Sequence, residues 1–201
     1  MKTSIAQSLR HSYSYSQYRK IIVDLLLVEK STGNEQSEDL THYSNLNETR
    51  MHRLDKTITI SEEYRDSLRA LKNNYIWLVI AEGWCGDAAQ LLPVFNKMAE
   101  GSDKIELRIV LRDENESLMN QFLTNGAKAI PKLIVLDKNN LSVEANWGPR
   151  PKGASDLIKN YKAQFGLIDQ TAKTELQLWY LHDQGLSTQK ELIDLMLDIE
   201  N

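Results

Sequence analysis

The spacing of apolar residues in the first third of the chain predicts amphipathic helices. Tyr18, Ile22 and Leu25 recur at intervals of three or four residues, so they share one face of a helix that is followed by a polar loop. Two further patterns with the same period come after that loop. The predicted helices cover residues 16–30, 40–54 and 62–71.

The pattern changes at residues 75–81, an uninterrupted apolar run that is rich in β-branched and aromatic residues. Such a run is typical of a strand buried on both faces of a sheet. Strand-like and helix-like patterns then alternate in the order β-α-β-α-β-β-α, which predicts an α/β fold with a mixed sheet and helices on both faces. The later predicted elements are a helix at 87–100, a strand at 104–111, a helix at 115–126 that ends at Gly126, a hairpin of strands at 131–137 and 141–147, and a helix at 152–166.

Two more helical patterns follow, and we expect them to form a helical hairpin packed on the sheet domain. Trp179 and Tyr180 lie on the packing face of the first helix, or alternatively form a dimer or partner surface. Thr188 and Glu191 are spaced as a capping box at the start of the second helix. The predicted units are an N-terminal helical extension at 1–72, a sheet domain at 73–166 and a C-terminal helical hairpin at 167–201.

The composition narrows the classes of function. The chain is 41% hydrophobic and 26% charged with a net charge of -4, so it lacks a general basic surface and nucleic acid is not an expected partner. No stretch approaches the roughly 18 apolar residues of a spanning helix, and the N-terminal region has no signal-peptide pattern. We therefore expect a cytoplasmic protein without membrane association. The four histidines have no ligand spacing, so neither a metal nor a cofactor is predicted.

Cys85 is the only cysteine, so the chain has no internal disulfide framework, which fits a reducing compartment. It stands between a predicted strand and a predicted helix in the stretch E-G-W-C-G-D-A-A-Q. The amides at a helix N-terminus favour a thiolate, whereas the carboxylate of Asp87 disfavours one. Arg150 or Lys132 would favour the thiolate if either pointed into the same groove. The sequence alone leaves the direction of the pKa shift of Cys85 open.

Several motifs at fixed spacing resemble the thioredoxin superfamily. Trp84, Cys85 and Gly86 match the start of its W-C-G-P-C motif, Pro93 matches its helix proline, and A-I-P-K-L at 129–133 resembles its G-I-P-T-L segment. The resemblance covers residues 73–166 and implies a thioredoxin-like fold in which Pro131 is cis and Gly148 borders the substrate groove. More narrowly, W-C-G-D-A resembles a bacterial thioredoxin-like family, which implies a bacterial origin.

The main departure from the thioredoxin pattern is Ala88, which stands where a dithiol site has its second cysteine. Ala88 cannot release a mixed disulfide, so a standard self-resolving reductase is not expected. The buried acid that assists proton transfer in thioredoxins falls near Val79 and Ile80, and the nearest carboxylate is that of Glu82.

The first hypothesis is therefore thiol-disulfide exchange by Cys85 alone. Its partner would be a disulfide-bearing protein or a low-molecular-weight thiol, and an external thiol would resolve the product. The resemblance implies that the motif and groove around Cys85 consist of Trp84, Gly86, Asp87, Ala88, Ile130, Pro131 and Gly148.

Other functions stay open at this stage. In the second hypothesis, Trp84, Ile130, Pro131 and Trp147 hold a peptide or another domain, and Cys85 is a small buried hydrophobe without catalytic activity. A helix-mediated assembly role is third, and a Cys-His pair for acyl transfer would need a histidine that the sequence does not single out. The arginine and carboxylates at 112–114 follow a predicted strand end, where a ligand site or a solvated charged turn is expected. The sequence predicts neither the substrate nor the oligomeric state.

Overall fold

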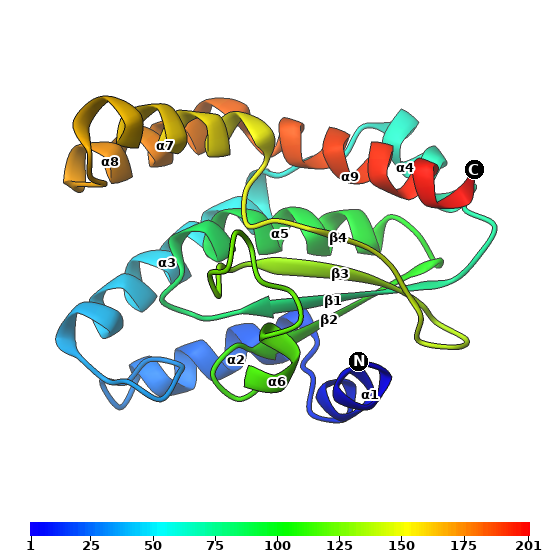
Figure 1. Ribbon diagram of the computed structural model, residues 1–201, viewed down its shortest axis with the longest axis horizontal. Helices are drawn as coiled ribbons and strands as arrows, with labels where there is room; N and C mark the ends of the chain where they lie inside the picture. The colour runs from blue at the N-terminus through cyan, green and yellow to red at the C-terminus, as the bar shows by residue number, and fades with distance from the viewer.

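A four-stranded mixed sheet forms the centre of the protein (Figure 1). The computed structural model describes all of the residues, 1–201. The strands lie in the order β2-β1-β3-β4; β1 pairs parallel with β2 and antiparallel with β3, and β3 and β4 form an antiparallel hairpin. This arrangement confirms the predicted α/β class. The strands are β1 (Tyr75–Ala81), β2 (Ile105–Leu111), β3 (Lys132–Asp137) and β4 (Val143–Trp147).

The apolar run of β1 is explained by burial on both of its faces. All seven residues of the strand are buried. Trp77 has no exposed surface, and its ring meets the ring of Phe95 edge to face at 6.5 Å. Its indole nitrogen lies 3.4 Å from the sulfur of Met196, near the end of the chain. Segments far apart in the sequence therefore complete a single core around β1.

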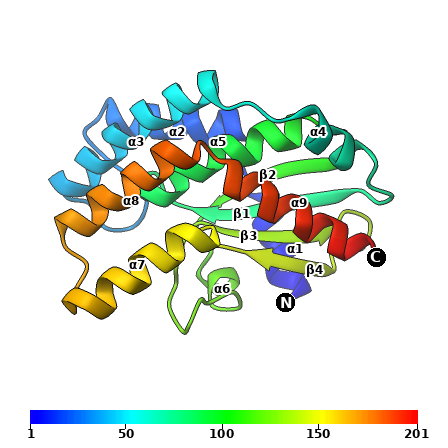
Figure 2. The ribbon, with the colours of Figure 1, turned by 90° about the horizontal axis from the view of Figure 1, so that it is seen from above.

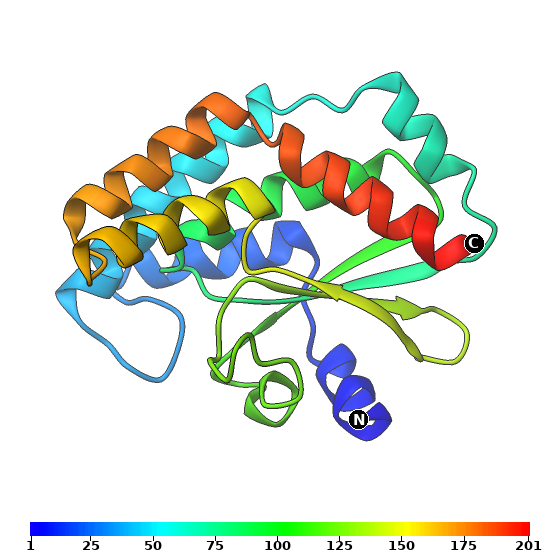
Figure 3. The same ribbon diagram turned by 45° about the horizontal axis from the view of Figure 1, so that its top comes forward.

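Helices cover both faces of the sheet (Figures 1 and 3). On one face lie α5 (Gly86–Glu100), α7 (Lys152–Phe165) and α9 (Leu186–Glu200). On the opposite face lie α1 (Lys2–Arg10) and the short α6 (Glu116–Met119).

The N-terminal region supplies three more helices, which flank the sheet. α2 contacts β2, and α3 packs against both α2 and α5. Arg19 of α2 is paired with Glu48 and Asp55 of α3, which joins the two helices. These helices are α2 (Tyr15–Leu26), α3 (Glu38–Thr57) and α4 (Glu62–Arg69).

The polar N-terminal stretch before α2 is also ordered, which its sequence did not predict. Ile5 of α1 is fully buried. Beyond α1, the N–H and C=O groups of Tyr13 pair with those of Ile109 in β2 at 2.7 and 2.8 Å. The chain thereby adds one residue to the outer edge of β2.

The predicted helix at 115–126 is too long by two turns. The observed helix α6 ends at Met119, and Thr124 and Ala127 then form a small turn closed by reciprocal backbone hydrogen bonds of 2.9 and 3.0 Å. Leu118 and Phe122 are nevertheless buried. The apolar spacing therefore reflected burial of these side chains rather than a continuous helix.

The two expected C-terminal helices are present, α8 (Gln170–Asp183) and α9, but α8 packs beside α7 while α9 extends over β4 and α4 (Figure 2). The predicted capping box is wrong, because the N-cap of α9 is Gly185 and Thr188 is buried inside the helix. Glu191 instead accepts hydrogen bonds from the indole N–H of Trp147 at 2.8 Å and the backbone N–H of Lys152 at 2.7 Å. A tertiary contact has taken the place of the local cap.

Two glycines with the same backbone angle provide a test of how α9 is seated. Gly166 and Gly185 both have φ of 79°, but only at Gly185 would an added Cβ meet a neighbour, a methyl carbon of Val94 at 2.8 Å. We expect Gly166→Ala to lower the free energy of unfolding by about 1–2 kcal/mol through backbone strain. Gly185→Ala should cost about 1–3 kcal/mol more through overpacking. Urea unfolding measures both, and equal losses would contradict the close packing of Gly185 on α5.

Candidate functional site

Cys85 lies at the start of α5, where the chain leaves the end of β1. It is the N-cap of the helix, and its sulfur accepts a hydrogen bond from the backbone N–H of Ala88 at 3.5 Å. The thiol donates to the backbone carbonyl of Ile130 at 3.4 Å. Only 7% of Cys85 is exposed. The structure thus brings Cys85 and its neighbour Ala88 together with Ile130, which lies 45 residues further along the sequence.

The loop opposite Cys85 is shaped by Pro131 and Gly148. The Ile130–Pro131 and Gly148–Pro149 peptides are both cis. Gly148 has φ of 112°, and a Cβ there would lie 2.5 Å from the carbonyl oxygen of Pro131. Only glycine fits this close approach of two backbone segments. Lys132 is directed toward β4, because its Nζ donates to the Asn146 side chain at 3.2 Å and to the Gly148 carbonyl at 3.5 Å.

A buried ion pair stands beside the thiol. Asp87 is 7% exposed, and its two carboxylate oxygens accept hydrogen bonds from Arg150 at 2.9 and 2.6 Å. The hydroxyl of Tyr180, from α8, donates to the same carboxylate at 2.8 Å. Burial and the neighbouring carboxylate raise the pKa of Tyr180 well above its ordinary value, so the hydroxyl keeps its proton. Arg150 is therefore the cation that balances Asp87, and Lys132 is not.

The surroundings of Cys85 keep its thiol protonated. Burial raises the pKa of Cys85 to about 12, and the negative charge of Asp87 contributes in the same direction. The backbone N–H groups of Ala88 and Asp87 and the positive charge of Arg150 act in the opposite direction but are outweighed. The shift that the sequence left open is upward, and burial is its largest cause.

The N-terminal extension contacts the motif around Cys85, residues 82–90. The side-chain amide of Asn47 donates to the carbonyl of Gly83 at 2.9 Å, and Arg50 donates to the Asn47 side chain at 2.7 Å. Asn47 has no exposed surface. These contacts were missed because no local pattern in α3 points to a site.

The C-terminal extension reaches the motif from the other side. Gln177 of α8 accepts a hydrogen bond from Gln90 at 2.7 Å, and its amide nitrogen lies 3.7 Å from where a Cβ on Gly86 would stand. Figure 2 shows α8 crossing above the beginning of α5. Tyr180 was expected to pack on the sheet domain, but its bond to Asp87 had no signal in the sequence.

The two tryptophans of the binding hypothesis lie in different surroundings. Trp84 is half-buried under the guanidinium of Arg112, which stands 4.9 Å from the centre of its ring. Trp147 packs edge to face on Phe95 at 5.8 Å and is bonded to Glu191 of α9. Trp147 thus takes part in the packing between the sheet and α9 while keeping some exposed surface, and its role in binding a partner stays a prediction.

Glu82 is a buried carboxyl close to the motif. It has no exposed surface; one oxygen accepts the backbone N–H of Asp113 at 3.0 Å, and the other has no hydrogen-bond partner. Burial raises its pKa. β1 itself has no acidic residue, and the buried carboxyl nearest to the expected position is that of Glu82, just after the strand.

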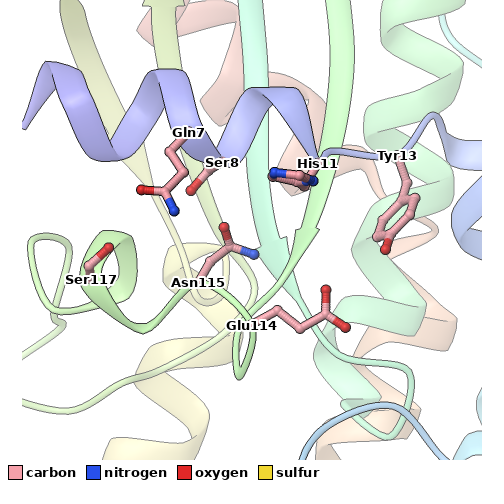
Figure 4. Close-up of a pocket in the computed structure, with 7 residues that line it drawn as sticks. All are labelled: Gln7, Ser8, His11, Tyr13, Glu114, Asn115 and Ser117. Atoms are coloured by element: carbon pink, nitrogen blue, oxygen red, sulfur yellow. The ribbon is translucent and has the colours of Figure 1, made fainter.

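The charged segment after β2 has two surroundings. Arg112 and Asp113 pair with each other at 2.8 Å next to Trp84, which accounts for them as structural residues. Glu114 instead lines a polar cleft of about 210 Å³ between α1 and the loop after β2 (Figure 4). The cleft is lined by Gln7, Ser8, His11, Tyr13, Glu114, Asn115 and Ser117.

No group of three or more histidine, cysteine or acidic side chains is placed to hold a metal ion. No helix combines the length and apolar character needed to cross a membrane.

The sheet, the helix that begins at Cys85 and the facing Pro131 loop together define a thioredoxin-like fold. A sequence model of the family described as thioredoxin matches residues 33–162, more than half of the chain. The chain therefore belongs to the thioredoxin family.

Two solved structures share this fold. A protein of unknown function from Pseudomonas aeruginosa is 15% identical with a TM-score of 0.59, over 92% of this chain and 98% of its own. An HIV epitope scaffold is 17% identical with a TM-score of 0.57, over 92% of this chain and 99% of its own. No curated protein sequence matches the chain. At these identities the likeness describes the fold alone.

The charge of Asp87 can be tested by replacing it with asparagine. In Asp87→Asn the amide oxygen still accepts from Tyr180, but Arg150 loses its counter-charge and the hydrogen bond to the second carboxylate oxygen, so we expect a loss of about 1–3 kcal/mol in the free energy of unfolding. Removing the negative charge also lowers the pKa of Cys85, so its alkylation by iodoacetamide should become faster at fixed pH. Asp156→Asn breaks an exposed pair with Lys152 and is the control, with no change expected in alkylation. Unchanged stability and alkylation in Asp87→Asn would contradict this electrostatic role.

Proposed function

We propose that the protein carries out thiol-disulfide exchange through Cys85 as a single nucleophile. The sulfur stands at the N-terminus of α5 within reach of the Ala88 amide, and it faces the backbone of Ile130 just before Pro131. Ala88 provides no second thiol, so an external thiol completes the reaction. A low-molecular-weight thiol of a reducing compartment such as the cytoplasm is the proposed resolving partner.

The proposed chemistry has two exchange steps. The Cys85 thiolate attacks one sulfur of a substrate disulfide, the substrate S–S bond breaks, and the second sulfur leaves as a thiolate that takes up a proton. A mixed disulfide now joins Cys85 to the substrate. An external thiolate then attacks this bond at the substrate sulfur and forms a new disulfide with the substrate, and the Cys85 thiolate is released. The substrate thus ends with one free thiol and one mixed disulfide, and Cys85 is regenerated.

One observation carries the proposal: burial is the largest cause of the raised pKa of Cys85, ahead of the negative charge of Asp87. The carboxylate of Asp87 is already paired with Arg150, and two backbone N–H groups point at the sulfur. When the sulfur meets solvent, the contribution of burial is reduced, while the charge of Asp87, the N–H groups and Arg150 remain. Exchange therefore requires a conformation in which the motif is uncovered.

The burial of Cys85 also favours a second candidate, a thioredoxin-fold binding module without catalytic activity. A cysteine that is 7% exposed and protonated behaves as a small hydrophobic residue. In this case the surface around Ile130 and Pro131 would bind a partner, and Cys85 would be replaceable without loss of binding. Formation of a covalent adduct at Cys85 separates the two candidates.

We expect the full chain to form a mixed disulfide with one glutathione when incubated with oxidised glutathione. Intact mass measures the adduct, and a reducing agent should remove it. The rate should rise with pH, and its midpoint should stay above the ordinary thiol value of about 8.5, because the closed conformation holds the thiol protonated. Cys85→Ser is the control and should gain no mass. If the wild-type chain gains no glutathione even at alkaline pH, single-thiol exchange is wrong and the binding module is favoured.

A further inference from the structure

Helix α8 crosses the motif but lies outside the part of the chain that matches the thioredoxin family, which ends at residue 162. Two of its side chains contact the first turns of α5: the Tyr180 hydroxyl bonds to Asp87 at 2.8 Å, and Gln177 bonds to Gln90 at 2.7 Å. Gln177 also stands over Gly86, the residue next to Cys85. A helix added to the fold therefore covers the start of the helix that bears the thiol.

α8 packs on α7 through Trp179 but has only three buried residues of its own. Its buried residues are Ala172, Leu176 and Tyr180, whereas Leu178 and Leu181 are 48% and 47% exposed. The helix that follows, α9, buries five residues against the sheet and α5 and is more firmly held. A helix with few buried contacts opens at lower cost than one that shares the main core.

Both ends of α8 have backbone suited to movement of the helix as a unit. The chain before α8 turns at Gly166, where φ is 79°. At the other end, Gln184 and Gly185 have φ of 53° and 79° and separate α8 from α9. Hinges are typically a few such residues at the ends of elements. Displacement of α8 would also separate it from α7, where Trp179 lies against Gly153.

On the other side of the motif, helix α3 is held firmly against α5. α3 packs along α5, and its residue Asn47 is fully buried with its amide bonded to the Gly83 carbonyl. Breaking this contact would leave two buried polar groups without partners, which is costly. The side of the motif covered by α8 is therefore the side that opens.

We propose that α8 is a removable cover over the Cys85 motif, fastened by Tyr180 and Gln177, and that its displacement admits the substrate to Cys85. The proposal deepens the function proposed above and rests on it for the identity of the substrate. The surface uncovered by α8 consists of the backbone of Gly86, the Asp87–Arg150 ion pair and Gln90. Its mixed polar character fits a polypeptide segment that carries the disulfide.

The test removes the fastening groups and measures access to Cys85. In the double variant Tyr180→Phe with Gln177→Ala, the aromatic ring stays but both hydrogen bonds to α5 are lost. We expect alkylation of Cys85 by iodoacetamide to become about tenfold faster or more, as two lost hydrogen bonds allow. Leu181→Ala, on the exposed face of the same helix, is the matched control and should alkylate like the wild type. Intact mass follows the reaction.

Hydrogen exchange on the same variants distinguishes local opening from global unfolding. We expect faster exchange of the backbone amide hydrogens in α8, with unchanged amide exchange in β1 and α9. An unchanged alkylation rate in the double variant overturns the proposal, and so does faster exchange throughout β1, since the whole fold would then be opening. Faster alkylation of Cys85 without a glutathione adduct supports α8 as a cover and contradicts thiol-disulfide exchange as the function. An adduct that forms equally fast in wild type and double variant supports the function and overturns the cover.

Discussion

The fold depends on the need to bury β1 on both faces. Its seven residues are all buried, so helices must cover the sheet above and below, and these helices come from both ends of the chain. The segment that follows β1 is buried as well. Glu82 has no exposed surface and Cys85 is 7% exposed. The chemical state of the thiol is thus set by how the central strand is packed.

The charges around Cys85 are balanced instead of one-sided. Asp87 stands next to the thiol, but Arg150 and the hydroxyl of Tyr180 bind its carboxylate. A buried carboxylate without such partners would be strongly destabilising. Arg150 neutralises the charge of Asp87, and Tyr180, which belongs to α8, attaches that helix to the same carboxylate. Electrostatics of the thiol and position of α8 are therefore coupled.

The elements of the sheet could be predicted closely because each strand and its neighbouring helix carry a local pattern. Tyr75–Ala81 was predicted at its observed bounds, and the family resemblance implied that Pro131 borders the groove around Cys85. Contacts between distant segments had no such signal. Asn47 and Gln177 look like ordinary polar residues of surface helices, and only the fold brings them to the motif. Glu191 was read as a helix cap, although a tertiary partner competes for its carboxylate.

The pairing of Tyr13 with Ile109 has a consequence for solubility. An unpaired sheet edge is a template for strand addition by another molecule, and proteins protect such edges with short extra segments or charged residues. The single-residue bridge at Tyr13 occupies backbone groups at the β2 edge, beyond which no strand lies. At the opposite edge, β4 is short and exposes Glu144 and Asn146. Each edge of the sheet is thereby protected by a different device against association with another copy of the chain.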